Sequence, residues 1–510
     1  MSELTKGIVS GTRVESMSDL DARVRRMAGG LDALGVKAGD CVSILMRNDI
    51  AFLEASYAAM MLGAYAVPIN WHFKGEEVAY VLGDSESKVL IGHTDLIAPI
   101  AHDLPKDVTI VCVPPPPEVV AAYHLAPSAP PAAAHDYEAW IAAQSPYSGP
   151  KRAAPQSMIY TSGTTGHPKG VKRMAPTPEQ EAELDVVRAT IYGLKHGIRT
   201  ALPGPLYHSA PNSFCMRAGR IAEAVFLMPK FDPIELLELI QREKIDTMFM
   251  VPTMFIRLLK LPEEVRRKYD CSSIRHIIHA AAPCPPDVKK AMIDWWGPVI
   301  FEFYGGTESG PVTFSTTADA LAKPGTVGRV SPGAELRILD EDGKILGRNE
   351  IGEIFSRMPC YPDFNYNKLP EKRKEIDRDG FITCGDVGYV DDDGYVFICD
   401  RKRDMVISGG VNIYPAEIEA VLHAAPGVHD CAVFGIPDAE FGEALMAVVE
   451  PFAGKSVDIE AVRAHLMAHL ANYKVPRVIE VQDKLPREDS GKIFKRRLRD
   501  PHWEKAGRTI

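Results

Sequence analysis

Short apolar runs alternate with helical patterns in the first part of the chain, and this alternation restricts the fold more than any other feature. The runs that resemble buried strands are Cys41–Met46, Ala64–Ile69, Lys88–Ile91 and Val108–Val113. A helical pattern from about Ile50 to Leu62 separates the first two runs. An earlier helical pattern precedes them, with Ser18 as the expected N-cap and Gly35 as its end. Continuous apolar strands separated by helices are typical of parallel sheets covered on both faces.

The same alternation returns after residue 170 and predicts a second α/β layer. The expected strands are Thr247–Val251, Ile274–His279 and Val299–Phe303, and the expected helices are Pro252–Leu259 and Pro286–Trp296. From about Gly325 short segments are separated by Asp-Gly pairs, which indicates antiparallel hairpins or a small barrel.

Past the charged cluster Asp400–Asp404 the pattern becomes that of a compact α+β unit of about one hundred residues. We therefore predict an α/β protein in three parts. A large N-terminal domain (1–400) contains two packed α/β sheet layers and a small β-barrel. A hinge (401–404) leads to a small, mobile α+β C-terminal domain (405–510).

Composition excludes several classes of function. The net charge of −10 leaves no excess of Lys and Arg to neutralise nucleic-acid phosphates. The nine Cys include no CxxC pair, so neither a disulfide framework nor a structural zinc site is expected. The first residues lack the apolar core of a signal peptide, and the longest uncharged run, Ala55–Trp71, is too short and broken to span a membrane. We expect a cytoplasmic protein with no integral membrane segment.

The stretch Tyr160–Gly170, with the sequence YTSGTTGHPKG, has the composition of a polyphosphate-binding loop. Its glycines allow successive N–H groups to point at one anion, its hydroxyls can bind Mg²⁺, and its Lys adds a mobile positive charge. It is not the common P-loop, because Pro168 stands where that motif has its second Gly and Gly170 follows Lys169. A flexible surface loop is the alternative interpretation.

Four other clusters have compositions that suit nucleotide chemistry. Tyr304–Glu308 follows an expected buried strand, and ligands of open α/β sheets bind beyond the carboxyl ends of strands. Asp386 lies in an expected turn and could accept hydrogen bonds from ribose hydroxyls. Arg401–Asp404 precedes a Gly pair, and Lys492 follows Ser-Gly and could stabilise developing negative charge. Taken singly, each could be a turn, a solvated charge run or a basic tail.

Two further features are set aside. His465 and His469 lie one helical turn apart but lack the Glu between them that a zinc protease needs. Cys284 has no base nearby in the sequence, so we do not expect it to act as a nucleophile.

Taken together, the clusters resemble the motifs of the acyl-activating, adenylate-forming superfamily, and more specifically its acyl-CoA synthetase (carboxylic acid–CoA ligase) branch. They follow the superfamily's order along residues 15–500: Tyr160–Gly170, Pro205–His208, Ala280–Pro283, Tyr304–Glu308, Gly385–Asp386, Arg401–Asp404, Gly409–Gly410 and Ser490–Lys492.

The resemblance implies a role for each matching residue. The residues expected to bind ATP or AMP are Thr161, Ser162, Gly163, Thr164, Thr165, Lys169, Ala281, Ala282, Tyr304, Gly305, Thr307, Asp386 and Arg401. The expected catalytic residues are Lys492, Thr165, Glu308 and His208, with Glu308 and Thr165 also expected to hold Mg²⁺. The acyl pocket is expected to include His208, Phe214, Phe303 and Gly310. Gly409 and Gly410 would border the CoA channel, and Arg403 falls at the hinge position, which is often Asp in these enzymes.

The resemblance also implies a reaction in two steps with ATP, Mg²⁺ and CoA. A carboxylate attacks the α-phosphorus of ATP and pyrophosphate leaves; the CoA thiol then attacks the acyl adenylate and AMP leaves. Lys492 would serve the first step, and rotation of the C-terminal domain would admit the thiol for the second.

Two alternatives stay open at this point: an enzyme that loads the thiol of a carrier protein or stops at the adenylate, and a nucleotide-binding protein without chemistry. The acid could be fatty, bulky cyclic (steroid-type) or aryl. Sequence spacing does not rank these acids, because pocket residues converge from distant segments. A homodimer is possible.

Overall fold

The first α/β layer is a five-stranded parallel sheet in the order β4-β3-β5-β6-β7. The computed structural model describes residues 4–150, 152–161, 168–401, 404–408, 411–438, 441–487 and 493–505. The strands of this sheet are β3 (Cys41–Leu45), β4 (Tyr65–Pro68), β5 (Val89–His93), β6 (Thr109–Val113) and β7 (His135–Asp136). The predicted strands in this part of the chain are thus confirmed.

The N-cap of helix α1 (Met17–Ala33) lies two residues earlier than predicted. The Ser16 hydroxyl accepts a hydrogen bond of 3.1 Å from the Asp19 amide, so Ser16 is the N-cap. The prediction of Ser18 is wrong because Ser18 already lies within the first helical turn. Gly35, with φ of 81°, follows the end of the helix as predicted.

The second layer is a nine-stranded sheet in the order β16-β15-β14-β13-β12-β10-β11-β1-β2, parallel from β1 through β14 and antiparallel at both edges. Its strands are β1 (Gly7–Ser10), β2 (Arg13–Glu15), β10 (Arg199–Leu202), β11 (Ala224–Leu227), β12 (Thr247–Met250), β13 (His276–His279), β14 (Ile300–Gly306), β15 (Gly310–Ser315) and β16 (Arg329–Val330).

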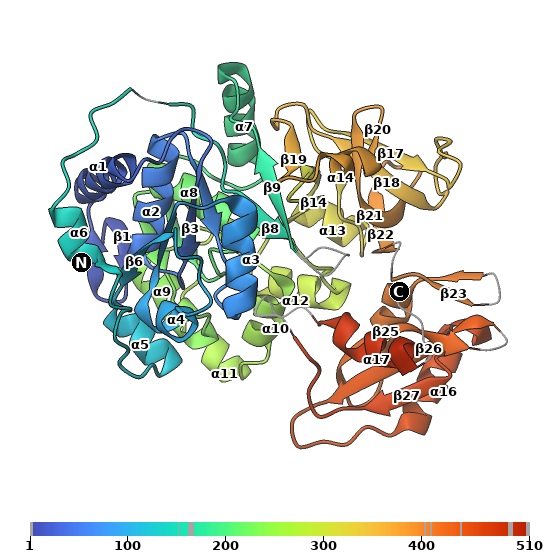
Figure 1. Cartoon of the computed structure of the whole chain (residues 1–510). Helices are drawn as coiled ribbons and strands as arrows, with labels where there is room; N and C mark the ends of the chain where they lie inside the picture. Colours follow the sequence, from blue (N-terminus) through green and yellow to red (C-terminus); the bar gives the residue numbers. More distant parts are fainter. Residues whose placement is uncertain are drawn as a thin grey trace.

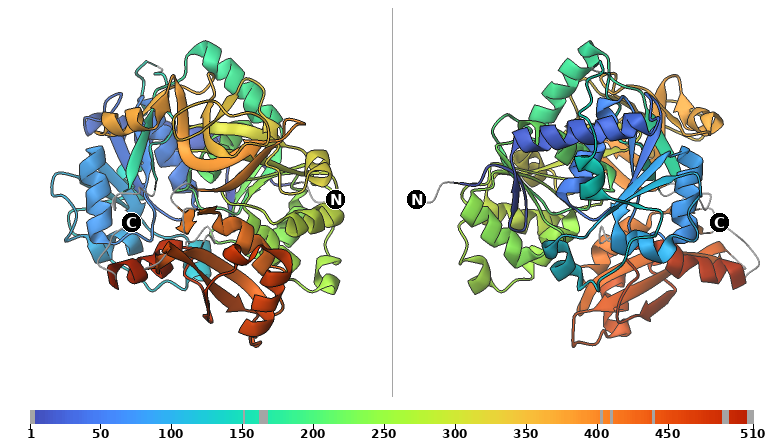
Figure 2. Two further views of the ribbon diagram at one scale, coloured as in Figure 1. Left: turned by 90° about the vertical axis from the view of Figure 1, so that its right-hand side faces the viewer. Right: turned by 60° about the vertical axis from the view of Figure 1, so that its left-hand side comes forward.

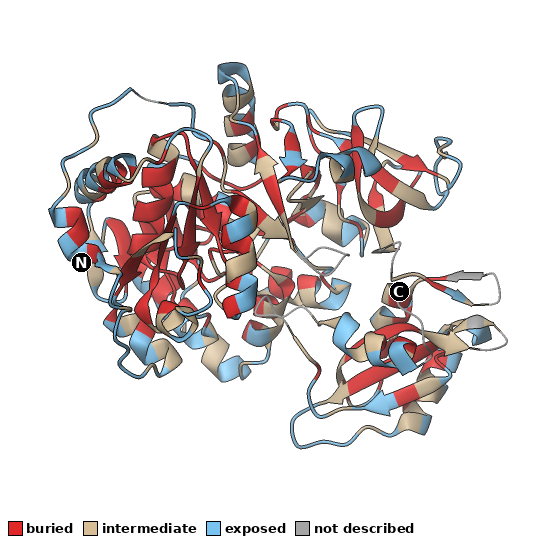
Figure 3. Ribbon diagram, viewed as in Figure 1, coloured by how far each residue is buried: buried red, intermediate tan, exposed pale blue. Residues whose placement is uncertain are grey.

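Helix α2 (Ile50–Met61) is shared by both layers and is buried on nearly all sides. It packs in one apolar core with side chains of the first sheet, such as Ile44, and of the second, such as Phe249. Its sequence is apolar all round, as a helix enclosed by protein requires. The predicted packing of two α/β layers is confirmed, and Figure 3 shows the buried interior that they share.

Strands of the predicted barrel region belong to two smaller sheets, one of which also includes two earlier strands. One is β19-β9-β8, with β8 (Ile159–Thr161), β9 (Lys169–Arg173) and β19 (Phe364–Tyr366). The other contains β17 (Glu335–Leu339), β18 (Gly352–Arg357), β20 (Asp377–Arg378), β21 (Phe381–Val390) and β22 (Val396–Arg401). Asp386 lies within β21, beside a register shift, so the prediction that it occupies a turn is wrong. The flanking Gly385 made the sequence look like a turn, and in the structure it has a φ of 77° within the strand.

The segment after residue 404 forms a separate α+β unit around a sheet of β23 to β27. Its strands are β23 (Val406–Ser408), β24 (Val411–Ile413), β25 (Val428–Asp438), β26 (Gly442–Pro451) and β27 (Val478–Val481). Helices α15 (Pro415–Leu422) and α16 (Ile459–His469) contribute Ile418 and Val462 to its core. Figures 1 and 2 show this unit, coloured orange to red, beneath the rest of the chain.

The remaining helices surround the sheets. They are α3 (Gly75–Ser85), α4 (Thr94–Ile97), α5 (Pro117–Tyr123), α6 (Tyr137–Ala142), α7 (Pro178–Thr190), α8 (Ser209–Ile221), α9 (Pro233–Glu243), α10 (Pro252–Leu259), α11 (Glu263–Arg266), α12 (Pro286–Trp296), α13 (Thr317–Ala322), α14 (Pro370–Glu375) and α17 (Lys495–Lys505). Among the described residues, no helix combines the length and apolarity needed to cross a bilayer.

Candidate active site

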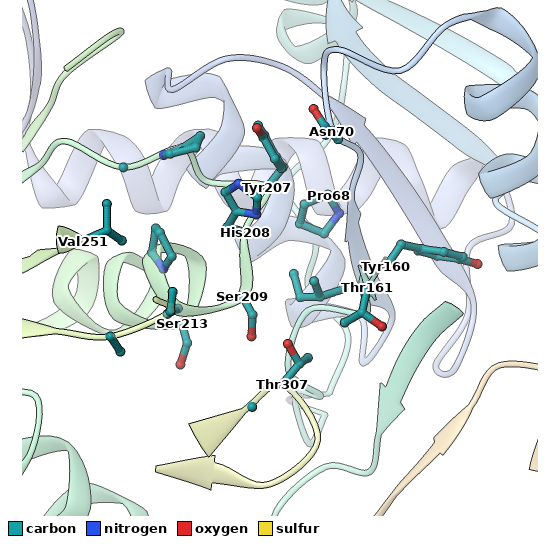
Figure 4. Close-up of a pocket in the computed structure, with 18 of the residues that line it drawn as sticks. Pro68, Asn70, Tyr160, Thr161, Tyr207, His208, Ser209, Ser213, Val251 and Thr307 are labelled. Carbon is teal, nitrogen blue, oxygen red and sulfur yellow. The ribbon is translucent and has the colours of Figure 1, made fainter. Parts of the chain in front are cut away.

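A cavity of about 1440 Å³ lies where the large sheets, the barrel strands and the C-terminal unit meet. Its walls include Thr161 and Lys169 beside the predicted phosphate loop, Thr307 and Glu308 after β14, and Asp386 in β21. Figure 4 shows Thr161 and Thr307 on facing segments of the cavity wall. The structure therefore brings together described residues from three of the predicted nucleotide motifs.

Tyr304 and Asp386 connect two of these motifs directly. The Tyr304 hydroxyl donates a hydrogen bond of 2.8 Å to Asp386 Oδ2. In the backbone register of strands β21 and β22, Asp386 lies opposite Arg401. The predicted adenine and ribose residues thus lie together, although they are separated by about eighty positions in the sequence.

Glu308 is held by residues that motif reasoning missed. The Tyr366 hydroxyl donates a hydrogen bond of 3.0 Å to Glu308 Oε1. The Lys169 ammonium lies 5.4 Å from the centre of the Tyr366 ring. Arg173 donates hydrogen bonds to the carbonyl oxygens of Thr307, at 2.9 Å, and Glu308, at 2.7 Å. These contacts fix the carboxylate of Glu308 from within the cavity wall, through Tyr366, and the backbone of its segment from behind that wall, through Arg173.

The oxygen atoms on this wall suit a hard cation. Glu308 offers a carboxylate and Thr307 and Thr161 offer hydroxyls, and Mg²⁺ prefers a few such oxygens together with substrate phosphates. Of these three side chains, only that of Glu308 is a carboxylate.

Several predicted residues lie outside the described part of the chain. They are Ser162, Gly163, Thr164, Thr165, Arg403, Gly409, Gly410 and Lys492. The flanks of the Lys492 segment are described, and Arg487 and Phe494 both line the cavity. Thr161 and Pro168, on either side of residues 162–167 of the predicted phosphate loop, line the cavity too.

The Ala280–Pro283 segment reaches the cavity through its first two residues. Ala280 and Ala281 line it, whereas Ala282 does not. Ala281 has a φ of 73°, in the left-handed region that disfavours a residue with a Cβ. Such strain is found most often where a ligand or catalytic group needs a fixed backbone.

His208 stands at the start of α8, on the cavity wall, and is half-buried. Burial, followed by repulsion from His72, lowers the pKa of His208 to about 4, so the ring is neutral near pH 7. Its Nε2 is buried and has no hydrogen-bond partner among the described residues. The Tyr207 ring lies 4.3 Å away, centre to centre. A bound ligand would satisfy this nitrogen.

Aromatic side chains enclose the part of the cavity next to His208. Phe303 packs against Tyr192 with ring centres 5.1 Å apart, and against Phe249 at 6.4 Å. Tyr361 lines the same region, and its ring lies so close to Gly310 that a Cβ there would come within 2.9 Å of it. Of the predicted pocket residues, Phe303 and Gly310 line the cavity.

Phe214 is the exception. It is buried behind Phe249, with ring centres 6.4 Å apart, and does not line the cavity. The sequence contained no signal for Tyr192, Phe249 or Tyr361, since none of them is near a recognised motif.

Residues of three predicted nucleotide motifs and a set of aromatic side chains thus line one cavity on this fold, as expected for an adenylate-forming enzyme. Comparison with known proteins gives the same answer. Residues 7–361 match the family described as "AMP-binding enzyme", and residues 417–492 match the "AMP-binding enzyme C-terminal domain". The chain belongs to the AMP-binding enzyme family, which confirms the predicted superfamily.

Curated relatives over almost the whole chain are CoA ligases. Feruloyl-CoA synthase of Amycolatopsis sp is 34% identical and covers 98% of this chain and 96% of the relative. Long-chain-fatty-acid–CoA ligase FadD13 of Mycobacterium tuberculosis is 32% identical, with coverages of 95% and 92%. Indoleacetate–CoA ligase of Aromatoleum aromaticum is 32% identical, with coverages of 94% and 92%. The predicted enzyme class, an ATP-dependent acid–CoA ligase, is confirmed.

Solved structures agree. ATP-bound MatB from Rhodopseudomonas palustris has a TM-score of 0.83 at 30% identity, covering 98% of this chain and 96% of that one. The anthranilate CoA ligase AuaEII, in complex with anthranoyl-AMP, has a TM-score of 0.85 at 26% identity, with coverages of 99% and 95%. The predicted fold class is confirmed along the whole chain.

Proposed function

We propose that this enzyme joins an aromatic carboxylic acid to CoA through an acyl adenylate. The observation that carries the choice of acid is the ring-lined pocket formed by Tyr192, Phe249, Phe303 and Tyr361 next to His208. Offset and edge-on contacts between aromatic rings contribute about 0.5–1.5 kcal/mol beyond area burial, so these walls favour a flat ring over a flexible chain.

The pocket suits a ring without a charged substituent. The guanidinium groups of Arg173 and Arg188 interact with Tyr361 and Tyr192, respectively, but neither Arg residue lines the cavity. The carboxylate of a ring held here would lie between the neutral His208 and the Thr307 segment. A neutral His next to the carboxylate leaves that group's negative charge free to act as the nucleophile.

The first half-reaction needs no nucleophile from the protein. A carboxylate oxygen of the acid attacks the α-phosphorus of ATP, a new P–O bond forms, and the bond to pyrophosphate breaks. Negative charge grows on the phosphate oxygens, where Thr161, Thr307 and Lys169 can donate hydrogen bonds. Lys492, whose flanks line the cavity, would add a further cation. Mg²⁺ held at Glu308 would neutralise part of the phosphate charge.

The second half-reaction exchanges AMP for a thiol. The sulfur of CoA attacks the acyl carbonyl carbon, the thiol proton is lost, and AMP leaves with the electrons of the broken acyl–phosphate bond. In our proposal residues 405–510 rotate on a hinge near Arg403 relative to residues 1–400. This motion withdraws Lys492 and brings Gly409 and Gly410 to border the thiol's path.

An acid panel tests the proposal. ATP–pyrophosphate exchange and mass-spectrometric detection of acyl-CoA are measured for benzoates, cinnamates, ferulate and indoleacetate, and for fatty acids of increasing length. We expect the best aryl acid to exceed every fatty acid in kcat/KM by at least about tenfold, or roughly 1.4 kcal/mol. A fatty acid that surpassed all aryl acids would overturn the aromatic assignment. Exchange without any CoA thioester would point to the carrier-protein alternative.

A pair of variants links the preference to the pocket. Phe303→Leu removes a ring that lines the cavity, whereas Phe226→Leu removes a ring that is equally buried in strand β11 but does not line it. The first should reduce the preference for aryl acids, and the second should not.

A further inference from the structure

Helix α3 carries none of the sequence motifs, yet it contacts both flanks of residues 162–167 in the predicted phosphate loop. In Figure 1 the helix stands beside β8 and β9, the strands that precede and follow those residues. Glu77 and Val81 of the helix line the cavity. Tyr80 and Asp84 lie four positions apart, so their side chains leave the helix on one face.

The first flank of the loop is held through Tyr160. Its hydroxyl donates a hydrogen bond of 2.6 Å to Asp84 Oδ2. Tyr160 lies opposite Gly170 in the register of β8 and β9, and a Cβ on Gly170 would come within 2.9 Å of the Tyr160 ring. Gly170 thus leaves the space that the ring occupies. Because Tyr160 directly precedes Thr161 on the cavity wall, the Asp84 contact fixes the point at which the chain enters the loop.

The second flank is held through Pro168. The Tyr80 hydroxyl donates a hydrogen bond of 3.3 Å to the Pro168 carbonyl. Pro168 lines the cavity and directly precedes Lys169. The rings of Tyr80 and Tyr160 pack against one apolar core, which includes Val81. A single helix therefore sets the positions of both flanks.

Asp84 also contacts the segment that holds Glu308. Asn367 Nδ2 donates hydrogen bonds to the Asp84 carbonyl, at 2.6 Å, and to Asp84 Oδ2, at 3.2 Å. The Asn367 amide donates a hydrogen bond of 2.8 Å to the Gly170 carbonyl. The preceding residue, Tyr366, is the one that donates to Glu308. One carboxylate thus links the phosphate loop to the support of the wall carboxylate.

We propose that Tyr80 and Asp84 are positioning residues for the β- and γ-phosphates of ATP. They hold the two flanks of residues 162–167 at a fixed spacing, which lowers the entropy cost of binding the phosphates. This inference rests on the proposed adenylation step. It assigns α3 a role in the affinity for ATP and pyrophosphate, and none in the affinity for AMP, which lacks these two phosphates.

Binding of three ligands tests the assignment. Dissociation constants of ATP and pyrophosphate, both with Mg²⁺, and of AMP are measured by calorimetry for the wild type, Tyr160→Phe, Tyr80→Phe and Asp84→Ala. Each Tyr→Phe substitution should raise the constants for ATP and pyrophosphate about threefold to tenfold, as expected for one hydrogen bond. Asp84→Ala should raise them about tenfold or more, because its carboxylate accepts two hydrogen bonds. The constant for AMP should not change.

Two matched controls separate these contacts from general destabilisation. Glu76→Ala removes an exposed carboxylate from the same helix, and this residue does not line the cavity. Tyr147→Phe removes a hydroxyl that donates to the Pro150 carbonyl at 3.4 Å, again away from the cavity wall. Neither should alter the binding of any of the three ligands. Asp84→Asn, which keeps an acceptor oxygen for Tyr160, replaces Asp84→Ala if urea unfolding shows that the latter is not folded.

Equal increases in the constants for ATP and AMP would overturn the assignment, because the defect would then not concern the β- and γ-phosphates. Unchanged ATP and pyrophosphate binding in Tyr160→Phe and in the Asp84 variant would overturn it as well. Failure of the underlying function looks different, since the wild type would then bind ATP but give no pyrophosphate exchange with any acid of the panel.

Discussion

The hydroxyl of Tyr304 donates a 2.8 Å hydrogen bond to Asp386 and so joins the nine-stranded sheet to the barrel strands. In the proposed function these two residues contact the adenine and the ribose of one ATP molecule. The bond fixes the spacing between the two contacts before ATP arrives, which lowers the entropy cost of binding.

Removing this hydrogen bond should weaken ATP binding more than it slows the reaction. Tyr304→Phe should raise KM for ATP about threefold to tenfold, since a net hydrogen bond is worth about 0.5–1.5 kcal/mol. Asp386→Ala should have a larger effect, because it also removes the proposed ribose acceptor. Both are measured in pyrophosphate exchange, with Tyr389→Phe, elsewhere on β21, as the control. A normal KM for ATP in Asp386→Ala would contradict the ribose assignment.

Lys492 should serve only the first half-reaction. Lys492→Ala should reduce the rate of pyrophosphate exchange about 10²–10³-fold, the usual loss when one donor to developing negative charge is removed. Conversion of a supplied acyl adenylate to acyl-CoA should stay close to the wild-type rate, because that step no longer involves pyrophosphate. The exposed Lys484→Ala is the matched control. Equal losses in both half-reactions would show that Lys492 is not specific to adenylation.

Gly310 should limit the size of the acyl ring. A Cβ at this position would come within 2.9 Å of the Tyr361 ring, and the residue has a φ of 71°. Gly310→Ala should therefore cost about 1–2 kcal/mol of folding stability and push Tyr361 into the pocket. Bulky aryl acids should lose more kcat/KM than benzoate does.

Gly325→Ala separates these two effects. Gly325 has a φ of 86°, but no atom lies within 4 Å of the Cβ that the substitution would add. It should carry the backbone cost without a change in acid preference, as measured by urea unfolding and by the same acid panel. An identical change of preference in both variants would show that the pocket effect is indirect.

Local features of the chain were predictable where the physics is local. The apolar runs became strands because buried parallel strands need apolar side chains on both faces, as in Cys41–Leu45. Cap positions were less certain: Ser16 and Ser18 can both cap a helix, and only the geometry shows which hydroxyl meets the Asp19 amide. Asp386 was expected in a turn because Gly residues lie on both sides of it. Glycine is equally compatible with an irregular strand, which is what the structure contains here.

The walls of the site were not predictable, because they depend on contacts between distant segments. Tyr366 reaches Glu308 from 58 positions away, and Arg173 reaches the same segment from 135 positions away. Tyr192, just after α7, contacts Phe303 of β14, which lies more than one hundred positions further along the chain. Sequence motifs thus indicated the expected nucleotide-binding residues, whereas the residues around the proposed acid pocket could be identified only from the structure.

Buried histidines should make the enzyme sensitive to acid. Burial lowers the pKa of His276 to about 4; Lys195 lowers it further, whereas the hydrogen bond of 2.8 Å that its Nε2 donates to the Ile191 carbonyl opposes the shift. The unfolded chain takes up a proton near pH 6.5 while the folded chain does not. The stability that this group contributes is therefore complete above pH 6.5 and is lost as the pH falls toward 4, at a cost of up to about 3 kcal/mol.

His276→Gln should lower the unfolding midpoint at pH 7, because a ring stacked on Phe301 at 4.3 Å is lost. It should also make the decline of the midpoint between pH 7 and pH 5 shallower than in the wild type, since one half-buried group no longer takes up a proton on unfolding. Urea unfolding at pH 7, 6 and 5 measures both effects, with the exposed His196→Gln as the matched control. Parallel pH profiles for the wild type and His276→Gln would show that the acid sensitivity has another source. The next residue to test is then His279, which is fully buried and whose pKa is also lowered by burial.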